Sequence, residues 1–344
     1  MASSYDECGA RPRHGDRGRL GRMIEGVALA LAALAFAVVS GANDGSTLIA
    51  LSLPNVALHP LAAIGLLAAA VVLVPLLAGA RVAETVARGL VSFEGSDGRL
   101  LFLSAVIVAL AVTGTLSRRG LPTSLTLALV GAVVGTGLGR GLGVAWGTVG
   151  SVIVIGLAAP LVSGCLGLLI ARAFAWLPAG HQAWGGLRML GAFAFVLQAA
   201  AYATNDGQKM IAIFAIALGL GPTGHVVVAL WSQVLLGLAF TLGAIWGIDR
   251  VANRLGRGVL RVRVVHSVAS EFAAAGAVLG SAWLGAPVST TQAATAAVVG
   301  AGVSETRWRV RWGQAARIGA AWVLTLPSAA ALGAVAAVLM AALR

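Results

Sequence analysis

Ten long apolar segments take up most of this chain and constrain its fold more than any other feature. Hydrophobic residues make up 59% of the 344 residues, and charged residues make up 10%. A helix needs about 20 mostly apolar residues to cross a bilayer, and its backbone must satisfy its own hydrogen bonds there. The segments therefore predict an all-α polytopic membrane protein. They fall at residues 24–53, 59–79, 100–116, 121–138, 144–173, 187–219, 222–248, 267–284, 286–303 and 314–342.

Two of the segments are interrupted by the same polar phrase. The first runs into Gly41-Ala42-Asn43-Asp44-Gly45, and the sixth runs into Ala203-Thr204-Asn205-Asp206-Gly207, before apolar sequence resumes. A carboxylate inside a membrane segment is costly. A glycine-containing polar break at matching positions of two halves is typical of transporters built from repeats, with the binding site at the broken helices.

Further landmarks recur in the same order in the two halves. The string Gly120-Leu121-Pro122-Thr123-Ser124-Leu125-Thr126 matches Gly285-Ala286-Pro287-Val288-Ser289-Thr290-Thr291, and each is followed by a small-residue run that ends in Val-Val-Gly. Segments 121–138 and 286–303 are marginal in length and could re-enter the membrane instead of crossing it. Five segments per half is an odd number, so the repeats should be inverted. We expect an arginine-rich tail over 1–23, a membrane repeat over 24–173, a linker over 174–186 and a second membrane repeat over 187–344.

The basic excess belongs to segments that flank the membrane. The formal net charge is +12, from 24 Lys and Arg against 12 Asp and Glu. Short arginine clusters beside apolar runs are typical of juxtamembrane anchors. No run interleaves aromatic with basic residues, so nothing supports nucleic-acid binding. Outside the tail, the arginines satisfy the positive-inside tendency when the N-terminus lies outside a cell (cytoplasmic) membrane.

Four ionisable residues stand out within the apolar segments: Asp44, Asp206, Lys209 and Glu271. Asp44 and Asp206 could cap a helix, and a capped half-helix inside the membrane is also an anion-binding device. Lys209 could pair with Asp206 or attract an anion directly. Glu271 could be a cation ligand or a buried acid held by hydroxyl groups.

The Gly-x-Pro strings add hydroxyl groups to both halves. In isolation, such a string is an ordinary helix N-cap, with proline in the first turn. Placed in both halves, the strings would bring hydroxyls and half-helix amides to the pseudo-two-fold axis, where four broken elements can surround a small tetrahedral oxyanion. The hydroxyl-bearing candidates are Ser124, Thr126, Ser289, Thr290 and Thr291.

These motifs resemble the signatures of the inorganic phosphate transporter (PiT) family. The similar strings are Gly-Ala-Asn-Asp in the first half, Asn-Asp-Gly-Gln-Lys in the second, and Gly-Ala-Pro-Val-Ser-Thr-Thr near the end. The resemblance covers nearly the whole chain after the tail. It implies secondary transport of phosphate driven by sodium or protons, an inverted-repeat fold and a homodimer. The first-half string departs from the family by carrying Leu125 and Leu127 where serine is common.

The sequence therefore predicts a phosphate symporter, and not an enzyme. Sodium ions or protons would be held by Asp44 and Asp206, with Glu271 as a further cation ligand, and would cancel the charge that otherwise repels an anion. Phosphate would bind Asn43, Asn205, Lys209 and the hydroxyl groups. A permease for sulfate or another oxyanion, and a passive anion channel, are the alternatives. The chain lacks the Gly-x-x-x-x-Gly-Lys-Ser/Thr loop of an ATP-driven pump.

Overall fold

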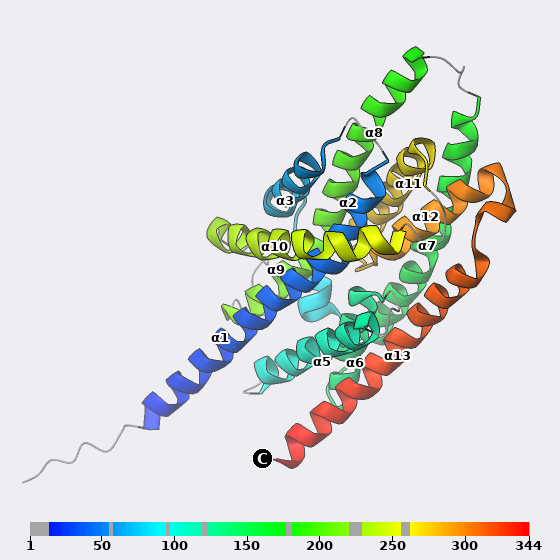
Figure 1. The fold of residues 1–344 in the computed structure, drawn as a ribbon. Helices are drawn as coiled ribbons and strands as arrows, with labels where there is room; N and C mark the ends of the chain where they lie inside the picture. Colours follow the sequence, from blue (N-terminus) through cyan, green and yellow to red (C-terminus); the bar gives the residue numbers. More distant parts are fainter. Residues whose placement is uncertain are drawn as a thin grey trace, which may run out of the picture.

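The computed structural model describes residues 14–54, 58–93, 97–118, 123–176, 181–219, 229–255 and 262–343, and these are almost entirely helical (Figure 1). One isolated bridge pairs Val91 with Val144. The helices, in chain order, are α1 His14–Ser40, η1 Gly41–Gly45, α2 Ser46–Ser52, α3 Pro60–Leu77, α4 Arg81–Glu84, η2 Thr85–Gly89, α5 Gly98–Arg118, α6 Leu125–Gly139, α7 Trp146–Phe174, α8 His181–Tyr202, η3 Ala203–Gly207, α9 Gln208–Ala217, α10 Leu230–Leu255, α11 Val264–Trp283, α12 Thr290–Glu305, η4 Arg307–Arg309 and α13 Trp312–Ala342.

Eight helical stretches among the described residues are long and apolar enough to cross a membrane. They coincide with eight of the ten apolar segments, so the all-helical membrane fold is confirmed. The two marginal segments form α6 and α12, of 15 and 16 residues. At 1.5 Å per residue these helices are about 22–24 Å long, short of a hydrocarbon core of about 30 Å. The short elements α4 and η2 were not predicted, because they lie in a stretch that carries no apolar run.

The two Asn-Asp phrases form π-helical turns and do not break their helices. Helix α1 continues through η1 into α2, and α8 continues through η3 into α9. This differs from the expected broken helix, and it also differs from the N-cap interpretation, because the residues at the start of α2 and α9 make no side-chain cap bond. A π turn accommodates one extra residue while the backbone stays hydrogen-bonded, and such turns are frequent at functional sites. In a bilayer this avoids the cost of an unwound backbone.

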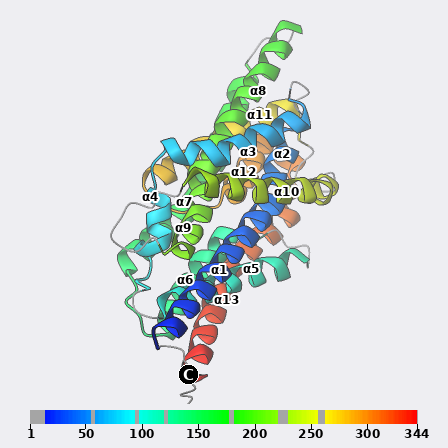
Figure 2. The ribbon, with the colours of Figure 1, turned by 90° about the vertical axis from the view of Figure 1, so that its left-hand side faces the viewer.

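The two halves of the chain pack into each other. Helix α6 lies along α13 and α12 lies along α7, while α1 crosses α10 and α3 contacts α8 (Figures 1 and 2). Glycines allow the backbones to approach closely. A Cβ added at Gly135 would lie 1.9 Å from the carbonyl oxygen of Ala330, and one added at Gly300 would lie 1.9 Å from that of Gly164. Such close contacts through small residues are the usual way in which helices associate in membranes.

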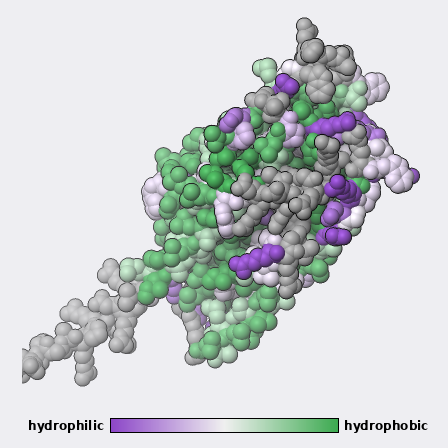
Figure 3. Space-filling view, in the orientation of Figure 1, coloured by the Kyte–Doolittle hydropathy of each residue, from purple (hydrophilic) through white to green (hydrophobic). Residues whose placement is uncertain are grey.

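The outer surface is apolar, as a lipid-facing surface must be. Figure 3 shows hydrophobic residues over much of the visible face. Large apolar side chains such as Leu161 and Val323 are 70% exposed. Three exposed tryptophans lie at helix ends: Trp146 begins α7, Trp283 ends α11 and Trp312 begins α13. Tryptophan is enriched at the membrane–water interface, where its ring meets the headgroups.

Candidate functional site

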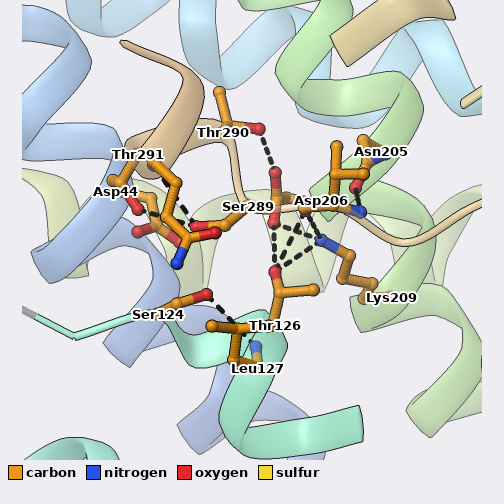
Figure 4. Close-up of polar contacts among 12 residues, drawn as sticks. Asp44, Ser124, Thr126, Leu127, Asn205, Asp206, Lys209, Ser289, Thr290 and Thr291 are labelled. Carbon is orange, nitrogen blue, oxygen red and sulfur yellow. Dashed lines mark hydrogen bonds and ion pairs between the residues drawn. The ribbon is translucent and has the colours of Figure 1, made fainter. Parts of the chain in front are cut away.

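Four elements far apart in the sequence meet in one buried polar cluster: the π turns η1 and η3, and the first turns of α6 and α12. Figure 4 shows Asp44 with Thr291 on one side of Ser289 and Asp206 with Lys209 on the other, while Thr290 reaches Asp206 from above. Both aspartates are 4% exposed. Buried charges need compensation by paired or hydrogen-bonding groups, so the surroundings of each carboxylate decide what the cluster can bind.

Helices α6 and α12 begin in the cluster with matching caps. Ser124, at φ −103° and ψ 112°, accepts a hydrogen bond from the Leu127 amide at 3.1 Å. Ser289, at φ −95° and ψ 112°, accepts one from the Gln292 amide at 3.4 Å. A capping hydroxyl accepts through its oxygen and can still donate its proton. Two helix N-termini therefore direct amides, hydroxyls and positive dipole ends toward the same cluster, which favours an anion.

The second-half aspartate is neutralised by a lysine. The ammonium of Lys209 lies 2.7 Å from Asp206 Oδ1, 2.7 Å from the hydroxyl oxygen of Thr126 and 2.5 Å from the carbonyl oxygen of Val288. The hydroxyl of Thr290 donates to the other carboxylate oxygen. Lys209 is 1% exposed. All three donor positions of this ammonium are occupied by protein oxygens, so in this arrangement Lys209 holds Asp206 and does not point a free charge into the cluster.

The first-half aspartate is held by a neutral amide. The side-chain NH2 of Asn43 donates to Asp44 Oδ1 at 2.7 Å and lies 3.4 Å from the carbonyl oxygen of Thr123. Thr291 lies beside the Asp44 carboxylate (Figure 4). Among the described residues no basic side chain forms an ion pair with Asp44. The two aspartates therefore differ in how their charge is compensated, although both lie in an Asn-Asp-Gly string.

Asn205 and Gln208 hold the backbone around the cluster. Asn205 donates to the Ala286 carbonyl oxygen at 3.1 Å and accepts from the Val288 amide at 3.2 Å, so its side-chain amide holds the extended segment that leads into α12. Gln208 Oε1 accepts from the amides of Val82 and Ala83 at 2.8 and 3.1 Å, and it thereby caps α4. Gln208 is not among the site residues that the sequence predicts. Its partners lie about 125 residues away, and no local pattern marks such a contact.

Glu271 lies outside the central cluster. It is 1% exposed on α11, and its Oε1 accepts from the Ser267 hydroxyl at 3.2 Å while Oε2 has no hydrogen-bond partner. The same Ser267 hydroxyl lies 2.7 Å from the Leu51 carbonyl oxygen. Among the described residues, no hydrogen bond joins Glu271 to Asp44 or Asp206. The described residues hold no group of three or more His, Cys, Asp and Glu side chains that could bind a metal.

A family model described as the phosphate transporter family matches residues 40–200 and 181–333. The chain belongs to the phosphate transporter family. The two matched ranges contain all four elements of the cluster, so the predicted family is confirmed on the residues that form the site.

Relatives in the phosphate transporter family cover most of the chain. The chain is 34% identical over 317 residues to a probable low-affinity inorganic phosphate transporter of Mycobacterium bovis, covering 88% of this chain and 74% of that protein. It is 27% identical over 321 residues to the protein of the same description from Bacillus subtilis, covering 90% and 95%. A solved structure, the sodium-dependent phosphate transporter, has a TM-score of 0.80 at 18% identity, covering 93% of this chain and 100% of that one, so the fold is shared.

Proposed function

We propose that this member of the phosphate transporter family is a cation-coupled symporter of inorganic phosphate across the cytoplasmic membrane. One observation carries the proposal: two buried carboxylates and two capped helix N-termini converge in one cluster between the halves of the chain. Helix N-termini attract an anion, whereas the carboxylates repel it. The anion therefore binds well only when the cluster holds enough cations. The names of the relatives, which refer to inorganic phosphate, support the choice of substrate.

Each polar side chain of the cluster has a role in the proposal. In the proposal, phosphate accepts hydrogen bonds from the hydroxyls of Ser124, Ser289 and Thr291 and from the first-turn amides of α6 and α12. The support is that Ser124 and Ser289 cap these helices and that Thr291 lies beside Ser289. Asn43 also contacts phosphate in the proposal. Within the part of the chain that the structure describes, only its NH2 group is hydrogen-bonded, whereas both the NH2 and the oxygen of Asn205 are used. Three other candidates take supporting roles in the proposal, because their polar groups are already used within the protein: Thr126, Thr290 and Asn205.

Coupling follows from mutual dependence. A cation that neutralises an aspartate raises the affinity for phosphate, and phosphate raises the affinity for the cation by the same factor. The coupling cation in the proposal is sodium or a proton, and the buried carboxylates of Asp44 and Asp206 are the groups in the cluster that could hold it. Glu271 is a further cation ligand, because a buried carboxylate with a free oxygen requires compensation. The reciprocal packing of α6 on α13 and of α12 on α7 supports two inverted repeats as the moving units.

Uptake into liposomes tests the proposal. Purified protein is reconstituted, and uptake of labelled phosphate is followed while a sodium gradient or a proton gradient is imposed separately. We expect accumulation above equilibrium with at least one gradient, and loss of that accumulation in Asp206→Asn. Uptake that only dissipates the phosphate gradient would identify an anion channel. Stronger inhibition by sulfate than by unlabelled phosphate would identify a sulfate permease. The homodimer and the external N-terminus stay predictions.

A further inference from the structure

The two Asn-Asp turns place different residues at the same position. Asp44 and Asp206 occupy matching places, and the residue three positions further on is Thr47 in the first half and Lys209 in the second. Lys209 reaches back to its aspartate at 2.7 Å. The hydroxyl of Thr47 instead donates to the carbonyl oxygen of Asn43 at 2.6 Å. A threonine carries no charge, so the first half has no built-in cation at this position.

The oxygens around Lys209 resemble the ligands of a bound metal cation. The ammonium contacts a carboxylate oxygen of Asp206, the hydroxyl oxygen of Thr126 and the carbonyl oxygen of Val288, at 2.7, 2.7 and 2.5 Å. Carboxylate, hydroxyl and backbone carbonyl oxygens are the ligands that hard cations prefer in proteins. The positive charge in this half is therefore supplied by the chain itself.

The first half contains the matching oxygens without the ammonium. When the Pro-x-Ser-x-Thr strings are paired, Thr126 corresponds to Thr291, and Val288 corresponds to Thr123. Thr291 lies beside the carboxylate of Asp44 (Figure 4). The carbonyl oxygen of Thr123 and Asp44 Oδ1 are bridged by the NH2 group of Asn43, at 3.4 and 2.7 Å. A neutral amide thus stands where the second half has a charge. Turning this amide over would present its oxygen as a further ligand.

We propose that Lys209 is a resident counter-cation that replaces one coupling ion, and that the central cluster therefore binds a single exchangeable sodium ion, at Asp44. Its ligands are the Asp44 carboxylate, the Thr291 hydroxyl, the Thr123 carbonyl oxygen and the turned Asn43 amide. This inference rests on the proposed function, because it assigns the coupling ion to one of the two aspartates.

Equilibrium binding of labelled sodium to the purified full-length protein tests the inference. Binding is measured in detergent without phosphate, with N-methylglucamine replacing sodium in the blank. Thr47→Lys supplies the first half with an ammonium and should bind one sodium ion fewer per chain than the wild type. Lys209→Thr vacates the second-half oxygens and should bind one more. Thr47→Val, which adds no charge, is the matched control and should bind as the wild type does.

A variant in which Thr47 and Lys209 are exchanged controls for the case in which a single variant misfolds. The double variant Thr47→Lys/Lys209→Thr keeps the total charge and should bind sodium with the wild-type stoichiometry. This double variant should lose one bound sodium ion when Asp206→Asn is added, whereas the wild type should lose one with Asp44→Asn. Unchanged sodium stoichiometry in both Thr47→Lys and Lys209→Thr would overturn the inference, as would a wild-type protein whose sodium binding is unaffected by Asp44→Asn.

Failure of this inference can be told apart from failure of the proposed function. If the wild type accumulates phosphate under a cation gradient but Thr47→Lys binds sodium normally, only the assignment of the cation site is wrong. If sodium binds in an Asp44-dependent manner but labelled phosphate is never accumulated, the cation site stands and the transport function is wrong.

Discussion

The buried ion pair between Lys209 and Asp206 allows a quantitative test of how the cluster is held. Their charged atoms lie 2.7 Å apart, and their side chains are 1% and 6% exposed. Lys209→Met preserves most of the side-chain length and removes the charge. Asp206 would keep the Thr290 hydroxyl but lose its cation. Removing one partner of a buried pair typically costs about 3–5 kcal/mol, because it leaves an uncompensated charge.

The double variant Lys209→Met/Asp206→Asn separates the charge effect from the packing effect. With both charges gone, no uncompensated ion remains, and replacement of a buried pair by neutral groups is often close to neutral in stability. We therefore expect the double variant to recover most of the stability that Lys209→Met loses, which is the coupling that a double-mutant cycle measures.

The assay is thermal unfolding of the purified protein in detergent, in a sodium-free buffer so that no sodium ion enters the vacated oxygens. At about 2–4 °C per kcal/mol, the value for domains of about 150–250 residues, the midpoint of Lys209→Met should fall on the order of 10 °C. Met210→Leu, at a neighbouring fully buried position, is the control and should change it little. A Lys209→Met midpoint close to that of the wild type, or a double variant no more stable than the single one, would refute the reasoning.

The other contacts of the site and of the helix packing lead to three further predictions. Asp44→Asn should abolish concentrative phosphate uptake in liposomes with the protein still folded, and near-normal gradient-driven uptake would contradict the coupling role. Ser289→Ala removes a hydrogen bond to a charged ligand worth about 1.5–3 kcal/mol, so half-saturation for phosphate should rise about ten-fold to a hundred-fold in competition uptake. Unchanged half-saturation would mean that Ser289 is only a helix cap. Gly135→Val places a side chain against the backbone of Ala330 and should abolish the monodisperse peak in size-exclusion chromatography. The control Gly150→Val meets open space and should keep that peak. Equal yields of monodisperse protein from the two variants would contradict the packing.

Much of the architecture follows from local sequence. Each membrane-length helix coincides with an apolar segment, because burial in lipid requires about 20 apolar residues in a row and a backbone bonded within itself. The caps of α6 and α12 were also predictable, since Ser124 and Ser289 each stand beside a Gly-x-Pro string where a new helix begins. The order of the landmarks in both halves predicted that the Asn-Asp turns and the Ser-containing strings belong to one site.

What the tertiary structure alone decided is how each charge is compensated. The sequence places Lys209 three residues after Asp206, but the other two partners of its ammonium, Thr126 and Val288, come from segments about 80 residues away. Gln208 likewise has distant partners: its side-chain oxygen accepts from the amides of Val82 and Ala83 at the start of α4. The sequence also suggested broken helices at Asn43-Asp44 and Asn205-Asp206, where the structure has π turns. Hydropathy and helix signals are local, whereas the compensation of a buried charge depends on which distant oxygens the packed helices bring within hydrogen-bonding distance.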